Sequence, residues 1–283
     1  MQKNTGLKIL SVSSVLLLVA ALYMVFVYAP LEAVMGAVQR VFYFHVAAGW
    51  VGALAFFVAF AAGLLHLRRG SLLADRVALC STEIGLVFMS MNIVSGAIWA
   101  RPIWNTWWTW DPRLTTATIT WLLYAAYLLL RQGIEDPQRR ARFAAVYGVI
   151  AFASVPLTFA ALRIFHSIHP VVIGAGAPGA KGSFDMTPAM RDTLLVSVLV
   201  FTVLYGTLLW HRLRLEQLSE RVAQMRLQLL QGRCGHGKYS GGDDLLPLAG
   251  CRRVWPAGWR LPCAAGAALA CIAGCAGWPA GEC

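Results

Sequence analysis

Six long apolar segments dominate this chain of 283 residues and restrict the folds that it can adopt. Each segment has about 20 residues, the length that an α-helix needs to cross the hydrocarbon core of a bilayer. Only 13% of the residues are charged, about half the share that is usual in soluble domains. We therefore predict an all-α, polytopic membrane protein with six transmembrane helices. The expected spans are 9–29, 41–67, 77–100, 112–130, 143–165 and 194–210.

Basic residues are concentrated in alternate connections between the apolar segments, and this asymmetry predicts the orientation of the helices. Cytoplasmic loops of membrane proteins carry an excess of Lys and Arg. Placing both termini in the cytoplasm gathers most of the basic residues on that side, among them Arg68 and Arg139. The stretches 30–41, 99–115 and 164–192 then lie on the outer side. The basic residues form no patch of the kind that binds nucleic acid, so the net charge of +11 reports membrane topology.

Tryptophan is concentrated in the outer stretch between the third and fourth segments. Five of the eleven tryptophans fall within residues 99–110. Trp104, Trp107, Trp108 and Asp111 are spaced i, i+3, i+4, i+7, so on a helix they would share one face. An indole surface bordered by a carboxylate and a guanidinium suits a flat aromatic ligand with charged edges, such as haem. The alternative is an interfacial belt, although five tryptophans are more than a belt needs in one loop. Asp followed by Pro also predicts an N-cap for the fourth helix.

Three histidines lie at the same expected depth as the tryptophans. His45 is about one turn inside the outer end of the second segment, and His166 and His169 stand at the outer end of the fifth. Two neutral imidazoles on opposite faces of a macrocycle are a usual way to hold haem iron. His166 and His169 also have the spacing of a metal pair, with Asp185 as a third ligand. No histidine lies in the middle of the bilayer, which disfavours an electron carrier with stacked intramembrane histidine pairs.

The C-terminal part of the chain differs in composition from the six-helix domain, which we place at 1–215. Apolar residues at spacings of three and four predict a cytoplasmic amphipathic helix at 216–231. Residues 232–283 are rich in Cys, Gly and Ala and hold six of the seven cysteines, without a C-x-x-C-H motif for covalent haem attachment. We expect this tail to be disordered and assign no function to it.

The run from Trp104 to Thr115 reads WNTWWTWDPRLT and resembles the WWD signature of a superfamily of haem-handling membrane proteins. Within that superfamily the chain is most similar to the cytochrome c maturation family CcmC, over about residues 10–215. Asn105 departs from the family pattern, which usually has Gly there. The resemblance implies haem contacts by Trp104, Trp107, Trp108, Trp110, Asp111 and Arg113, and axial ligation of the haem iron by His45 and His169.

The resemblance also implies a delivery protein rather than an enzyme. Haem b would be a transient cargo at the outer face of the cytoplasmic (inner) membrane. A periplasmic haem chaperone of the CcmE type would receive it for cytochrome c biogenesis. ABC transporter subunits of the CcmA and CcmB types and a small single-helix subunit of the CcmD type are the other implied partners. The alternative within the superfamily is a synthetase that joins haem directly to apocytochrome c. Such relatives have more helices and further intramembrane histidines, which this sequence lacks.

Overall fold

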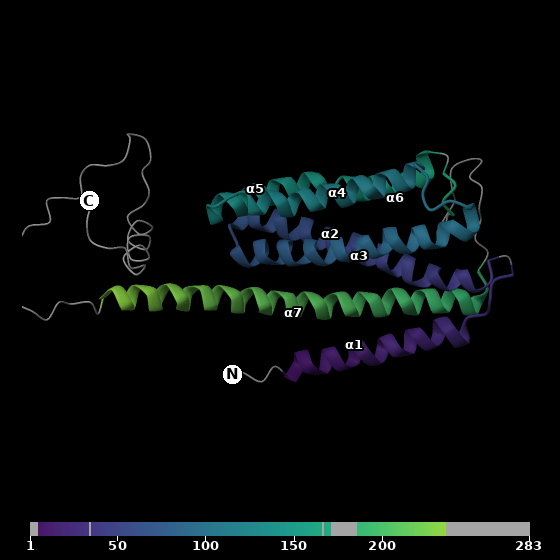
Figure 1. The fold of residues 1–283 in the computed structure, drawn as a ribbon, viewed down its shortest axis with the longest axis horizontal. Helices are drawn as coiled ribbons and strands as arrows, with labels where there is room; N and C mark the ends of the chain where they lie inside the picture. The colour runs from purple at the N-terminus through teal and green to yellow at the C-terminus, as the bar shows by residue number, and fades with distance from the viewer. Residues whose placement is uncertain (1–4, 34, 166, 171–185, 236–283) are drawn as a thin grey trace, which may run out of the picture. The chain divides into compact units, whose positions relative to one another are not determined.

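The computed structural model describes residues 5–33, 35–165, 167–170 and 186–235. Within these ranges the protein is all-α, and six of its helical segments are long and apolar enough to cross a membrane. The predicted fold class is therefore confirmed (Figure 1). The elements are α1 (Thr5–Tyr23), the π-helical turn η1 (Met24–Tyr28), the 3-10 turn η2 (Ala37–Gln39), α2 (Arg40–Arg69), α3 (Leu72–Trp104), α4 (Pro112–Gln132), α5 (Pro137–Ala151), α6 (Ser154–Ile164) and α7 (Pro188–Gly235).

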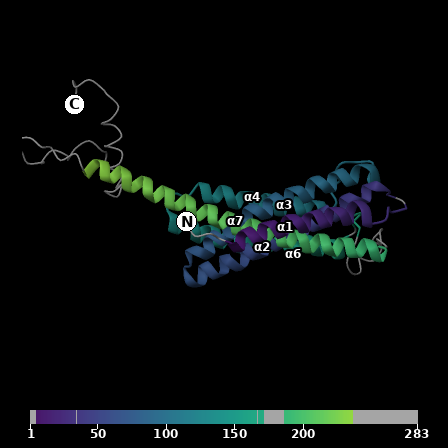
Figure 2. The same cartoon turned by 90° about the horizontal axis from the view of Figure 1, so that it is seen from below.

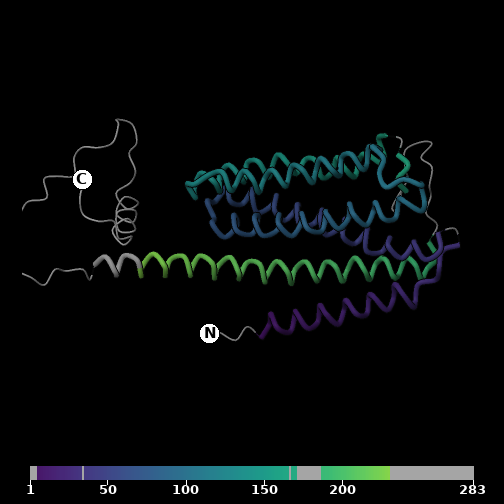
Figure 3. Tube along the Cα trace, viewed as in Figure 1, coloured from purple at the N-terminus to yellow at the C-terminus, as the bar shows by residue number. Residues whose placement is uncertain are grey.

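The transmembrane helices form layers around the antiparallel pair α2 and α3. In Figures 1 and 3, helices α4, α5 and α6 lie together on one side of this pair, while α7 lies on the other side. Figures 1 and 2 both show α1 running along α7. Hydrogen bonds between hydroxyl groups join these helices: Ser81 on α3 bonds to Tyr205 on α7 at 2.7 Å, and Ser14 on α1 bonds to Thr207 on α7 at 2.7 Å. Such bonds are a common means of association between helices in a bilayer.

Small residues allow α2 and α3 to approach closely. A Cβ atom added to Gly85 on α3 would lie 2.7 Å from the ring of Phe56 and 3.1 Å from the Cβ of Ala55, both on α2. Phe56 has little room to move away, because its ring is stacked on that of Tyr124 with centroids 3.6 Å apart. The contact thus brings α2, α3 and α4 together next to the pocket described below.

Gly85→Ala is therefore expected to destabilise the bundle. Overpacking of this kind costs about 1–3 kcal/mol, and we expect a lower midpoint in thermal unfolding of the detergent-solubilised protein. Gly206→Ala on α7 is the matched control, because nothing lies within 4 Å of the Cβ that it would add. A control as unstable as Gly85→Ala would mean that the cost does not come from the contact with Phe56.

The fifth apolar segment, predicted as one helix, is divided into α5 and α6. The break precedes Pro156, which has no backbone N–H to donate and whose ring disfavours the preceding helical turn. The carbonyl of Phe152 accepts instead from the backbone N–H of Val155 at 3.0 Å. After the break, α6 carries Thr158 and Phe159, which line the pocket.

The sixth segment continues much further than its apolar sequence. The sequence predicts an apolar span that ends near residue 210 and an amphipathic cytoplasmic extension at 216–231, and α7 runs without interruption from Pro188 to Gly235. Leu215, Leu218 and Val222 are exposed on this extension. The tail beyond residue 235 lies outside the described residues, so its expected disorder stays a prediction.

Candidate functional site

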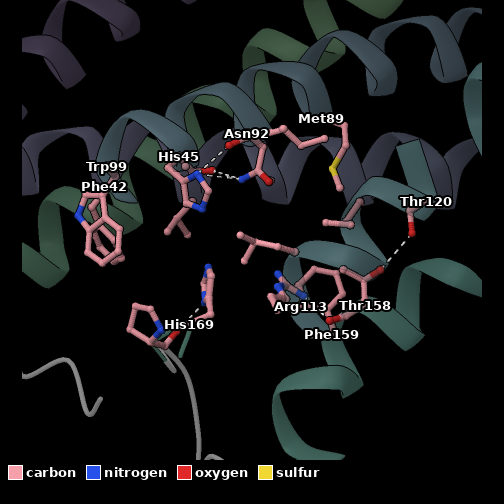
Figure 4. A pocket seen from close by; sticks show the side chains of 18 of the residues that line it. Phe42, His45, Met89, Asn92, Trp99, Arg113, Thr120, Thr158, Phe159 and His169 are labelled. Atoms are coloured by element: carbon pink, nitrogen blue, oxygen red, sulfur yellow. Dashed lines mark hydrogen bonds between the residues drawn. The ribbon is translucent and has the colours of Figure 1, made fainter. Parts of the chain in front are cut away.

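A pocket lies between the pair α2 and α3 on one side and α4 and α6 on the other, near the tryptophan-rich stretch (Figure 4). Its empty volume is about 1030 Å³, part of it open to the surroundings, which is at the upper end of the range for small-molecule sites. On α2 the lining runs from Phe42 to Phe56, a rise of about 21 Å along a helix. Most of the wall is apolar. Its polar or indole-bearing side chains are His45, Asn92, Trp99, Trp104, Trp108, Arg113, Thr120, Thr158 and His169.

His45 and His169 face each other across this pocket. His45 comes from the second turn of α2, and His169 comes from the short non-helical segment 167–170 that follows α6 (Figure 4). Their ring centroids are 6.2 Å apart, and their planes are inclined by 36°. Metal–imidazole bonds of about 2 Å, with each ring centre about 1 Å behind its nitrogen, place two opposite ligands with centroids about 6 Å apart. The separation therefore fits one metal ion between the two rings.

The environment of His45 selects which of its nitrogens carries the proton. Nδ1 lies 3.0 Å from the backbone oxygen of Asn92. A carbonyl only accepts hydrogen bonds, so Nδ1 is the protonated donor and Nε2 bears the lone pair. The side chain of Asn92 also donates to the backbone oxygen of His45 at 2.8 Å, which ties α3 to this turn of α2. Partners of this kind fix the tautomer and the orientation of metal-binding histidines.

His169 has the same tautomer for the same reason. Its Nδ1 donates to the backbone oxygen of Pro170 at 3.0 Å, which leaves Nε2 with the lone pair. Burial, together with the neighbouring Arg113 and His45, lowers the pKa of His169 from 6.5 to about 3. The ring is therefore neutral at physiological pH, the state in which imidazole binds metals.

The structure corrects the helical interpretation of the tryptophan-rich stretch. Helix α3 ends at Trp104, and the chain leaves it through Asn105 in the left-handed conformation, with φ 53° and ψ 24°. Residues 105–111 are non-helical, so the helix face inferred from the spacing does not exist. Asn is one of the few residues that adopt this conformation readily. Arg101 donates to the backbone and side-chain oxygens of Asn105 at 2.7 and 2.8 Å, so this turn forms without glycine.

The six predicted haem-contacting residues fall into two groups. Trp104, Trp108 and Arg113 line the pocket. Trp107 and Trp110 are 59% and 75% exposed on the loop 105–111, and neither they nor Asp111 line it. Whether any of the six contacts haem stays a prediction.

Sequence reasoning did not select two further residues of the pocket wall. Trp99 lies on the last turns of α3, and its ring meets that of Trp104 edge to face with centroids 5.3 Å apart. It belongs to the same tryptophan cluster, which was the available signal. Asn92 is an amide within an apolar span, and a polar side chain at such depth is itself a sign of function.

Arg113 brings a positive charge to the pocket from the first turn of α4. Its guanidinium donates to the backbone oxygen of Thr158 and lies 4.8 Å from the ring centroid of Phe159, both on α6 (Figure 4). Arg113 forms no ion pair with any carboxylate in the described part of the chain. Its charge is thus available to an anionic group in the pocket.

Asp111 is the N-cap of α4, as the Asp-Pro pair predicted. Its Oδ1 accepts from the backbone N–H of Arg113 at 2.9 Å. The same carboxylate accepts from Ser167 Oγ at 2.7 Å and from the backbone N–H of Ile168 at 2.9 Å. Asp111 therefore connects the loop 105–111 with the segment that carries His169.

The imidazoles of His45 and His169 are metal-binding side chains that line the pocket. The described residues contain no group of three or more His, Cys, Asp or Glu that could hold a metal ion. His166 and Asp185, the other members of the predicted metal group, lie outside the described residues. Two imidazoles facing each other supply the two axial positions of a haem, whose porphyrin supplies the other four ligands.

Comparison with known proteins shows the family of the chain. The family model CcmC, described as heme exporter protein C, matches residues 2–228. Heme exporter protein C of Bradyrhizobium diazoefficiens is 31% identical over 218 residues, which cover 77% of this chain and 81% of that protein. Heme exporter protein C of Rhodobacter capsulatus is 30% identical over 215 residues, covering 74% and 86%. Cytochrome c biogenesis protein CcsA of Prochlorococcus marinus is 43% identical over 76 residues, covering 27% and 25%. The chain therefore belongs to the heme exporter protein C family.

Proposed function

We propose that this protein binds haem b as a transient cargo and delivers it for cytochrome c biogenesis. The observation that carries the proposal is the pair His45 and His169, which face each other across the pocket with ring centroids 6.2 Å apart. Membership of the heme exporter protein C family supports the same cargo. The description of the family as a heme exporter supports delivery rather than catalysis.

The pocket wall suggests how haem is held. The Nε2 atoms of His45 and His169 bind the iron from opposite sides. The indole rings of Trp104 and Trp108 cover part of the macrocycle, and the guanidinium of Arg113 pairs with a propionate, a geometry in which arginine forms strong, charge-assisted bonds. We assign Trp107, Trp110 and Asp111 to the outer lip of the site, where the edge of the haem meets the loop.

The two ligands are supported differently, and this difference suits a cargo that must leave. His45 belongs to a transmembrane helix and is tied to α3 through Asn92. His169 belongs to a non-helical segment that is bonded to Asp111 through Ser167 and Ile168. A ligand on such a segment withdraws without any rearrangement of the helices, so the iron can pass to an acceptor.

The proposed location is the cytoplasmic membrane, with both termini in the cytoplasm and the pocket on the periplasmic side. A CcmE-type haem chaperone is the proposed acceptor. ABC transporter subunits of the CcmA and CcmB types and a CcmD-type single-helix subunit are the proposed neighbours in the membrane.

A transfer experiment separates delivery from synthesis. Haem-loaded protein in lipid nanodiscs is mixed either with the soluble domain of a CcmE-type chaperone or with an apocytochrome c that carries a C-x-x-C-H motif. We expect haem to move to the chaperone, and we expect the haem mixed with apocytochrome to stay extractable by acidified acetone. Formation of non-extractable haem on apocytochrome by this protein alone would instead establish the synthetase alternative.

The tryptophans that line the pocket should matter more than those outside it. The double variant Trp104→Leu, Trp108→Leu removes two aromatic surfaces, each worth about 1 kcal/mol beyond its buried area, so we expect haem affinity to fall about 10- to 100-fold. Trp110→Leu changes an exposed tryptophan of the same loop that we place at the outer lip, outside the pocket wall, and should lower the affinity far less than the double variant. Haem titration followed by absorbance measures both. An equal loss in Trp110→Leu would indicate that the loop, and not the pocket contact, is what matters.

Gly96 is expected to be required for the orientation of His45. A Cβ at this position would lie 2.9 Å from Cε1 and 3.3 Å from Nδ1 of the imidazole. Gly96→Ala should therefore tilt the ring, weaken haem binding about tenfold and shift the Soret band. Gly6→Ala is the control, because its added Cβ makes only an ordinary contact of 3.7 Å with Trp210. Unchanged haem binding in Gly96→Ala would show that the ring of His45 accommodates the methyl group.

A further inference from the structure

The carboxylate of Asp111 makes more contacts than an N-cap requires. A capping side chain needs one oxygen to accept from the backbone at the start of the helix. Asp136, which is also followed by proline, caps α5 in this way: its Oδ1 accepts from the backbone N–H groups of Gln138 and Arg139 at 2.8 and 2.9 Å. Asp111 caps α4 and in addition uses both oxygens to hold a segment 56 residues away.

The additional bonds lead directly to His169. Ser167 Oγ donates to Asp111 Oδ1 at 2.7 Å and accepts from the backbone N–H of His169 at 3.1 Å. The backbone N–H of Ile168 donates to Asp111 Oδ2 at 2.9 Å. Ser167 is also buried. Two consecutive residues before His169, neither of them in a helix, are thus bonded to one carboxylate.

We propose that Asp111 is the positioning residue of the second axial ligand: through Ser167 and Ile168 its carboxylate holds His169 in place opposite His45. The proposal rests on the proposed function, since it assigns His169 to haem iron. It has one consequence for release. The loop 105–111 and His169 are joined at Asp111, so a displacement of the loop by an acceptor withdraws His169 while His45 stays fixed on α2.

The test compares variants that separate this role from helix capping. Ser167→Ala removes two bonds of the connection, the one to Asp111 and the one from the backbone N–H of His169, and leaves the cap of α4 unchanged. Asp111→Asn keeps the size of the side chain and one acceptor oxygen but loses the charge and the second acceptor. Asp136→Asn is the matched control at the other Asp-Pro cap. His169→Gly defines the result of losing the ligand itself.

The first readout is the electron paramagnetic resonance spectrum of the ferric, haem-loaded proteins. Hydrogen bonds to a charged group are strong enough that losing them should shift the equilibrium between bound and free His169 about 10- to 100-fold. We expect Asp111→Asn and Ser167→Ala to gain a high-spin signal, which added imidazole converts back to low spin, as in His169→Gly. Asp136→Asn should match the wild type. Asp111→Asn in the His169→Gly background should cause no further change.

The second readout needs no haem. It is the rate of hydrogen–deuterium exchange, measured by mass spectrometry, in a peptide that covers residues 160–170. We expect exchange about tenfold faster in Asp111→Asn and Ser167→Ala than in the wild type or Asp136→Asn. If the wild type binds haem and the Asp111→Asn and Ser167→Ala variants have the wild-type spectrum, the positioning role is overturned, whether or not exchange is faster in the variants. A wild type that binds no haem overturns the proposed function instead.

Discussion

Replacing His45 or His169 by glycine is expected to lower the affinity for haem more than about 100-fold, since losing even the supporting partners of a metal ligand costs 10- to 100-fold. In both imidazoles Nδ1 donates to a backbone carbonyl, which leaves Nε2 as the atom for the iron, so we expect either substitution to remove one of the two proposed axial bonds. Haem titration followed by absorbance measures the loss. Because glycine leaves room for a small ligand, imidazole at millimolar concentration should restore much of the wild-type spectrum.

His211→Gln is the control for this experiment. His211 lies on α7 and bonds through Nε2 to Ser11 Oγ at 2.8 Å, and it does not line the pocket. We expect its haem affinity and spectrum to match those of the wild type. Wild-type affinity in both His45→Gly and His169→Gly would show that neither imidazole binds the iron.

The second large effect concerns the stability of the protein. It arises at the ends of α3 and α4 that lie away from the pocket. Asp75→Asn should destabilise the protein by about 3–5 kcal/mol, the usual cost of leaving a buried charge without its partner. Arg131 donates to both oxygens of Asp75, at 2.5 and 2.8 Å, and the two side chains are only 9% and 13% exposed. Thermal unfolding in detergent, followed by circular dichroism, measures the change.

Two comparisons give this experiment its controls. Asp192→Asn breaks an ion pair with Arg191 in which the charged atoms are 3.8 Å apart and the side chains of Arg191 and Asp192 are 63% and 49% exposed. We therefore expect the free energy of unfolding to change by less than about 1 kcal/mol. The double variant Asp75→Leu, Arg131→Met removes both buried charges and should be more stable than Asp75→Asn. If Asp75→Asn were as stable as Asp192→Asn, the buried pair would not be holding α3 and α4 together.

The membrane fold could be predicted from the sequence because it follows from local composition. An apolar run of sufficient length forms a helix in a bilayer wherever it occurs, since its backbone hydrogen bonds must be satisfied internally. The start of α4 at Pro112 was predicted for a similar reason, because Asp111 supplies the cap from the adjacent position. The break before Pro156 was not predicted, although the proline that causes it is visible in the sequence.

The interior of the site was harder to predict because it depends on contacts between distant residues. The spacing of Trp104, Trp107 and Trp108 suggested a helix face, but the left-handed turn at Asn105 ends the helix before the last two. Depth grouped His45 with both His166 and His169, and the family resemblance selected His169. Their facing geometry, in contrast, depends on the bonds made by Asn92 and Asp111. Those bonds join residues 47 and 57 positions apart, and no local pattern reports them.

The central claim is that His45 and His169 together hold haem iron, and the most direct test is the electron paramagnetic resonance spectrum of the detergent-purified wild-type protein, expressed with haem supplied. We predict a ferric low-spin signal typical of two imidazole ligands, with a matching Soret band. A colourless protein would contradict the account and leave the tryptophans as an interfacial belt. A purely high-spin signal would contradict it too, because one of the two histidines would then not be bound.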